Sequence, residues 1–157
     1  YNKAVEKSRV AEALTMLNSM EKAVDILVLN NGGFSNLRGK DFLGGEGTRQ
    51  DELVLDLGGL DCSMTQKKNN GSVLGTLHAC SSKNFAYSID GGSNRRGMFL
   101  DAWRIHKDDR TDYDEHYLLE INITSDNEKT RFCYYVDDLG QQVCESIAAQ
   151  GWEAEEY

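Results

Sequence analysis

Residues 1–29 carry the longest regular pattern in the chain, and this pattern limits the folds available to it. Apolar residues recur there every three or four positions, the spacing of one stripe on an α-helix. They are Val10, Leu14, Leu17, Met20, Val24 and Leu27. No proline interrupts the segment, and Asn30, Asn31 and Gly32 are residues that commonly end a helix. The sequence therefore predicts one long amphipathic helix over residues 1–29.

The composition of this helix changes along its length. Residues 1–9 are mainly small or charged, whereas residues 23–29 are almost all apolar. At 1.5 Å per residue the helix would be roughly 43 Å long, more than a small domain needs to cover its core. We therefore expect its C-terminal part to be buried in a globular head and its N-terminal part to form a stalk. The alternative is an ordinary N-terminal helix that lies on a sheet along its whole length.

Size and charge exclude several classes of protein. A chain of 157 residues fits a single domain. Its net charge of -9 argues against a nucleic-acid or anionic-membrane surface, because phosphate binding needs clustered Lys and Arg. The basic pairs Lys67-Lys68 and Arg95-Arg96 lie in segments rich in Gly, Asn and Ser. No apolar run reaches the ~20 residues that a membrane span requires.

Four cysteines favour disulfide bonds and an oxidising, exported compartment. Three pairings are possible, and we prefer Cys62 with Cys80 and Cys133 with Cys144 because each closes a short loop. Four buried free thiols are an alternative. A zinc site at Cys62, His78 and Cys80 is a further one, but these residues lack the close C-x-x-C spacing of structural zinc ligands.

From residue 84 onward the sequence has the period of two that is typical of strands with one buried face. The alternation covers residues 85–90, 117–124 and 131–136, and residues 98–106 form a further candidate strand. Turn residues such as Asp90-Gly91-Gly92 separate them. We expect residues 84–137 to form an antiparallel sheet of about four strands, after a variable Gly-rich loop region at residues 30–83.

Residues 138–157 are expected to form a C-terminal helix and tail. Val143, Cys144, Ile147 and Ala148 share a helical face, and Gly151 follows as a stop signal. A Cys133–Cys144 bridge would staple this region to the last strand. The expected fold class is therefore α+β, a single domain with a long N-terminal helix packed on an antiparallel sheet.

The segment YNKAVEKSRVAEALTMLNSMEKAVD resembles the part of the N-terminal helix that follows the membrane-spanning half in type IV pilins and type II secretion pseudopilins. The similarity in sequence is confined to about the first 30 residues, and the remainder is similar in architecture alone. The resemblance implies a pilin-like fold with a disulfide near the C-terminus, for which Cys133 and Cys144 are the matching positions. Cys62 and Cys80 are additional to the usual single bridge.

The resemblance implies a structural subunit of a bacterial pilus or pseudopilus, located at the cell surface. A hydrophobic half-helix before residue 1, processed and methylated at its N-terminus, would hold the subunit in the inner membrane and later pack in the filament core. The implied partners are copies of this chain and other pilins, with no nucleic acid bound by this head. A minor-pilin-like tip adhesin that binds a ligand through its Gly-rich loops, and a free-standing exported α+β ligand-binding domain, are the alternatives.

No motif in the sequence indicates an enzyme. The chain has neither a Gly-x-Ser-x-Gly elbow nor a His-Glu-x-x-His helix. His78, His106 and His116 lie in or beside polar segments and are expected to be hydrogen-bonded or exposed. The sequence therefore predicts no catalytic residues and no resident cofactor.

One acidic segment is a candidate calcium site. Residues 107–117 contain Asp108, Asp109, Asp112 and Asp114, and some pseudopilins are similar in binding calcium on the head. The spacing departs from the Asp-x-Asp-x-Asp-Gly template because Arg110 stands at a ligand position and no Gly follows. We favour a solvent-exposed hairpin loop. Asn70 and Asn122 match the short N-glycosylation pattern.

Overall fold

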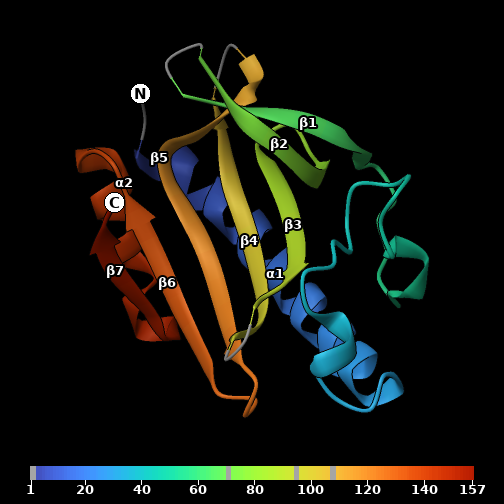
Figure 1. Ribbon diagram of the computed structural model, residues 1–157. Coiled ribbons are helices and arrows are strands. Elements are labelled where there is room, and N and C mark those ends of the chain that lie inside the picture. The colour runs from blue at the N-terminus through green and yellow to red at the C-terminus, as the bar shows by residue number, and fades with distance from the viewer. Residues whose placement is uncertain (1–2, 70–71, 94–95, 107–108) are drawn as a thin grey trace.

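The computed structural model describes residues 3–69, 72–93, 96–106 and 109–157 and places a long helix on one face of a seven-stranded sheet (Figure 1). Helix α1 is Lys3–Asn30, and helix α2 is Asp138–Ser146. The strands are β1 Asp61–Asn69, β2 Ser72–Ser81, β3 Phe85–Gly91, β4 Arg96–His106, β5 Asp109–Thr124, β6 Lys129–Tyr135 and β7 Trp152–Glu156. Short 3-10 turns occupy Ser35–Leu37, Gln50–Glu52 and Ala148–Gln150.

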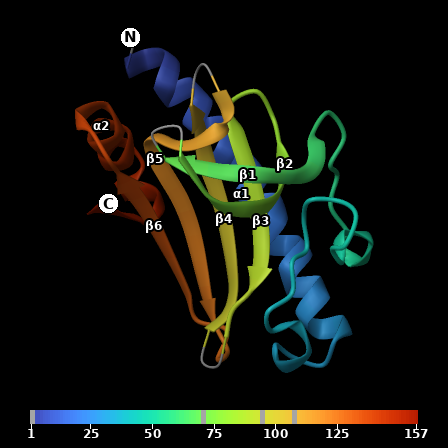
Figure 2. The same cartoon turned by 45° about the horizontal axis from the view of Figure 1, so that its top comes forward.

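The strands follow one another in chain order across the sheet. Neighbours from β1 to β6 are antiparallel, whereas β7 runs parallel to β6 at the edge. The β1–β2 hairpin bends across the face opposite α1 (Figure 2). There β1 also pairs in parallel with β5, through Lys68 and Asp112. The sheet is therefore mixed, and its upper part curls back on itself.

The expected α+β, pilin-like fold with an antiparallel sheet of about four strands is wrong. The described residues form a mixed sheet of seven strands with two α-helices, and one pair of neighbours in the strand order, β6 and β7, is parallel. The hairpin β1–β2 lies within the segment that we predicted to be a variable loop. We predicted a loop there because DCSMTQKKN, the sequence of β1, has no clear apolar alternation. Strand β7 arises within the predicted tail, where WEAEE alternates Trp and Ala with glutamates. An edge strand of this charged kind is common because glutamate deters pairing with further strands.

The core lies between α1 and the inner face of β3 to β6. Two of the predicted alternations point their apolar residues at the helix: Phe85, Tyr87 and Ile89 in β3, and Tyr117, Leu119, Ile121 and Ile123 in β5. In β6 the fully buried residue is Cys133, while the Phe132 and Tyr134 rings stack with 5.6 Å between centroids. The helix contributes the predicted stripe, with Val10, Leu17, Met20 and Leu27 buried.

The N-terminal part of α1 lies on the sheet and does not form the predicted stalk. Glu6 and Ala13 are 0% exposed and Val10 is 3% exposed. The helix ends where the sequence predicts, since the Gly33 amide donates to the Val28 carbonyl at 3.0 Å and Gly32 has a φ of 72°. The helix therefore contacts the rest of the domain from its first turns to its last.

Helix α2 is fixed to the sheet at both ends. Its N-cap Asp137 accepts a hydrogen bond from the Gly140 amide at 2.8 Å. A side chain at Gly140 would come within 1.9 Å of the His116 carbonyl oxygen, so only glycine allows this approach to β5. The Cys133–Cys144 disulfide joins β6 to α2, and Gly151 at a φ of 93° ends the turn that follows. These contacts place the end of α2 beside the sheet, so that the following residues can form β7.

Candidate functional site

A buried ion cluster fastens the N-terminal turns of α1 to the sheet. The Glu6 carboxylate, 0% exposed, accepts hydrogen bonds from Arg104 Nε at 2.7 Å and from the Tyr117 hydroxyl at 2.7 Å. Arg104 Nη2 donates to the second carboxylate oxygen at 3.3 Å. Arg9 adds a longer ion pair at 3.5 Å. A buried carboxylate with this many donors is fully compensated.

The partners of Glu6 are also held in place. Arg104 Nη1 donates to the carbonyls of Asn84 at 3.2 Å and Ile105 at 3.0 Å. Its guanidinium lies 5.7 Å from the centre of the Phe85 ring. Burial raises the pKa of the Tyr117 hydroxyl, and the charge of Glu6 raises it further. Each group is committed to the cluster, so this arrangement serves to position α1.

A second ion cluster holds the C-terminal half of α1. Lys129 of β6 lies 3.1 Å from Glu21 and 3.0 Å from Asp25, and Arg131 lies 2.5 Å from Glu21. Burial acts to raise the pKa of Glu21, but the hydrogen bonds from Lys129 and Arg131 together lower it. The two clusters lie far apart along α1 and resist both rotation and sliding of the helix.

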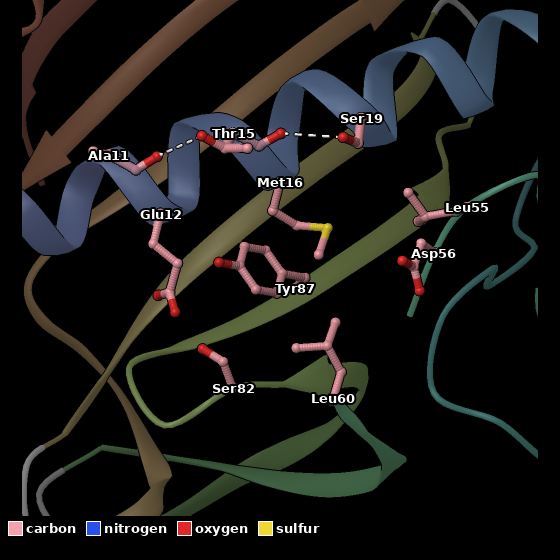
Figure 3. A pocket seen from close by; sticks show the side chains of 10 residues that line it. All are labelled: Ala11, Glu12, Thr15, Met16, Ser19, Leu55, Asp56, Leu60, Ser82 and Tyr87. Atoms are coloured by element: carbon pink, nitrogen blue, oxygen red, sulfur yellow. Dashed lines mark hydrogen bonds between the residues drawn. The ribbon is translucent and has the colours of Figure 1, made fainter. Parts of the chain in front are cut away.

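Between these clusters, a pocket of about 560 Å³ opens beside α1 (Figure 3). One wall is a flank of the helix, formed by Ala11, Glu12, Thr15, Met16 and Ser19. The opposite side comes from Leu55, Asp56 and Leu60 of the segment that leads into β1, together with Ser82 and Tyr87. Its volume is in the range of small-molecule sites, and its surface is mainly apolar.

Two polar groups in this pocket are not used by the fold. The Tyr87 hydroxyl is buried, the residue being 1% exposed, and within the described residues its polar neighbour Ser82 forms no well-aligned hydrogen bond with it. Glu12 makes no hydrogen bond or ion pair with that part of the chain. Burial raises the pKa of Glu12, while Arg104 and Arg9 act in the opposite direction. Figure 3 shows the Tyr87 hydroxyl pointing toward the Glu12 side of the pocket.

A third polar group of note lies on the opposite face of the sheet. Asp90 pairs with Asp41 through an isolated β-bridge, and its Oδ1 atom is buried without a partner in the described structure. Burial raises the pKa of Asp90 to about 7, and the charges of Asp41 and Glu120 add to this effect. The Asp90 carboxyl therefore holds its proton in the folded protein at pH values where the unfolded chain has lost it.

We expect the Asp90→Asn variant to be more stable than the parent at pH 8, by on the order of 2 kcal/mol, and no more stable at pH 4. The reason is that the folded state binds the Asp90 proton between about pH 4 and pH 7 whereas the unfolded state does not, so stability falls as pH rises through this window. Urea unfolding at both pH values measures this, with exposed Asp126→Asn as control. An equal gain at both pH values would show that the carboxyl is not the cause.

The structure forms both of the disulfides preferred from the sequence, Cys62–Cys80 and Cys133–Cys144. Cys62 and Cys80 are directly opposite one another in β1 and β2, so they are bonded to each other and not arranged as metal ligands. The two bridges indicate an oxidising compartment outside the cytoplasm. Neither α1 nor α2, the helices of the described chain, is long and apolar enough to cross a bilayer.

The other predicted polar positions are dispersed. His116 Nδ1 lies 2.6 Å from the Asp137 carboxylate, and His78 Nε2 lies 3.7 Å from that of Asp41. Within the described residues, no three His, Cys, Asp or Glu side chains are grouped to hold a metal ion. The calcium candidate lies outside the description, since it leaves out Asp108 and the side chains of Asp109, Asp112 and Asp114. The side chain of His106 and the whole of Asn70 also lie outside it; Asn122 is half-buried in β5.

No family model, curated protein or solved structure matches the chain. The geometry of its own residues therefore carries the functional argument.

The Glu6 cluster was not predicted from the sequence, although the sequence contains a signal for it. Glu6 lies four positions before Val10, so it continues the buried stripe of α1 toward the N-terminus. A charged residue on such a stripe implies a buried partner of opposite charge. The pocket had no comparable signal, because its walls come from segments distant in sequence.

Proposed function

We propose that this chain is the head of a non-enzymatic, exported filament subunit of the type IV pilin or pseudopilin kind. The observation that carries the proposal is the open face of α1. One face of the helix covers the sheet from Glu6 to Leu27, and the opposite face stays exposed over its length of about 42 Å. A long rigid helix with one free face is suited to lateral packing against copies of the same chain.

Apolar side chains on this open face support the proposal. Val5 is 42%, Ile26 40% and Leu29 81% exposed, so apolar surface occurs near both ends of the helix. These side chains would be removed from water if copies of the chain packed along this face. The ion clusters at Glu6 and Glu21 hold the helix in place on the sheet, so it would not shift when neighbouring subunits pack against its open face.

We further propose that an apolar helical segment continues α1 on its N-terminal side. It would hold the subunit in the inner membrane before assembly and then pack with its equivalents in the core of an extracellular filament. The support for this is the resemblance of the first helix to pilins, together with the oxidising compartment that the disulfides indicate. Head-to-tail contacts that do not close on themselves generate a helical fibre.

We expect Leu29→Lys to reduce filament yield without unfolding the head. Leu29 is 81% exposed, so lysine there should change the free energy of unfolding by no more than about 0.5 kcal/mol. A charge on the packing face must instead be desolvated when copies associate. Val54→Lys is the matched control, because Val54 is 69% exposed but lies outside α1. Equal filament yields for the two variants would contradict a role for the open face.

Immunogold labelling of cells that produce the full-length gene product tests the location. We expect label along the length of surface filaments and the chain among their main components after shearing. Label confined to filament tips would instead favour the adhesin alternative. Recovery of the chain only as a soluble exported monomer would overturn the filament proposal.

A further inference from the structure

We propose that the pocket beside α1 binds a small organic cation, a primary ammonium group carried on an aliphatic or aromatic body. This binding function is separate from assembly of a filament. The proposal rests on which polar groups of the pocket are already engaged, on the charges around it, and on the shape of its apolar wall.

Most polar groups that line the pocket are engaged elsewhere. The Thr15 hydroxyl donates to the Ala11 carbonyl at 3.0 Å, and the Ser19 hydroxyl to the Thr15 carbonyl at 3.3 Å. Asp56 accepts from the Gly58 amide at 2.9 Å, and Ser82 accepts from the Phe85 amide at 3.2 Å within its turn. The Glu12 carboxylate and the Tyr87 hydroxyl remain, and both can accept a hydrogen bond from a ligand.

A buried hydroxyl without a partner costs free energy unless a ligand or water completes it. Tyr87 is 1% exposed and is anchored by its ring in the core, so its hydroxyl cannot turn out to bulk solvent. It is held there by packing of the ring against Phe85, 6.1 Å away between centroids. The hydroxyl is therefore a fixed hydrogen-bonding group at the buried end of the pocket.

The charged groups of the pocket favour a ligand with a positive charge. Its lining contains the carboxyl groups of Glu12 and Asp56, and no Lys, Arg or His is found among the lining residues that the structure describes. Arg9 and Arg104, which act on Glu12 from a distance, share the buried Glu6 carboxylate. An anionic ligand would meet uncompensated negative charge, whereas an ammonium group would donate to Glu12 and to the Tyr87 oxygen.

The apolar wall defines the rest of the ligand. Met16, Leu55 and Leu60 line the side of the pocket away from Glu12, as Figure 3 shows. A flexible methionine adapts to aliphatic or aromatic bodies. A volume of about 560 Å³ accepts a body the size of a phenyl ring with a short chain.

Titration calorimetry and amide NMR of the whole chain with phenethylamine test the proposal, with phenylpropanoate as the anion of matched shape. We expect phenethylamine to shift the amides of the pocket-lining residues and to bind at least about tenfold more tightly than phenylpropanoate. Glu12→Gln should weaken binding about tenfold and Tyr87→Phe about threefold. Glu153→Gln, an exposed acid on β7, should leave binding unchanged.

Thermal unfolding of each variant checks that the fold is retained, and Glu12 is exposed enough for its substitution to be tolerated. Equal binding of the amine and the acid would overturn the proposal. So would unchanged binding by Glu12→Gln, or shifts that cluster outside the pocket.

Discussion

Replacing Glu6 by alanine is expected to lower the free energy of unfolding by about 3–5 kcal/mol, the largest effect of any single polar substitution considered for this chain. The loss arises because Arg104, whose side chain is only 4% exposed, would keep its charge in the core without the carboxylate that compensates it. The Tyr117 hydroxyl would lose its acceptor as well. Urea unfolding followed by circular dichroism measures the change.

Two further variants separate the ion cluster from general packing. Lys7→Ala replaces an exposed neighbour on α1 and should change stability by less than about 0.5 kcal/mol. Combining Glu6→Met with Arg104→Met removes both buried charges and should cost clearly less than the sum of the two single changes. A loss below about 1 kcal/mol for Glu6→Ala would show that the cluster does not fasten the helix.

Removing the Cys133–Cys144 disulfide by substituting both cysteines with alanine is expected to cost about 3 kcal/mol. The bridge spans 11 residues and joins two fully buried positions, one on β6 and one on α2. For a domain of this size the melting temperature should fall by roughly 6–12 °C. Differential scanning calorimetry measures the shift.

The same variant should affect β7 more than the centre of the sheet. Among the described strands, β7 pairs only with β6, and α2 precedes it in the chain. We therefore expect the Tyr157 amide, which donates to the Tyr135 carbonyl at 2.9 Å, to lose protection from hydrogen exchange. Loss of protection spread evenly over β3 to β5 would contradict this local role. Cys62 with Cys80 both changed to alanine is the control, because that bridge lies at the opposite end of the sheet order.

Local patterns were enough to predict the elements that have one buried face. The helix stripe from Val10 to Leu27, the alternations in β3 and β5, and the pairing of Cys133 with Cys144 were all predicted. Strands β1, β2 and β7 were missed. Strands β1 and β7 are polar, and β1 pairs along its length with its neighbour β2, whereas β7 pairs with β6. In β2, SVLGTLHACS, the apolar residues do not alternate regularly. Hydrophobic periodicity does not detect a strand that forms mainly because neighbouring strands pair with it.

The error at the N-terminal end of α1 has a specific physical cause. A charged first turn indicated exposure, but Glu6 is buried because Arg104, 98 residues away in the chain, supplies its counter-charge. Likewise, the pocket depends on how the segment of Leu55 and Leu60 folds back toward Met16. The periodicity of a single segment does not show which distant segment it will contact. It shows only that Glu6 lies on the buried stripe of α1.

Cryo-electron microscopy of filaments sheared from cells that produce the full-length gene product tests the central claim most directly. The account predicts a helical array in which this head repeats along the fibre. In it the open face of α1, with Val5, Ile26 and Leu29, would contact neighbouring subunits, and the sheet would lie on the outer side. Filaments that lack this head, or heads whose α1 face remains exposed to solvent in the assembled fibre, would contradict it.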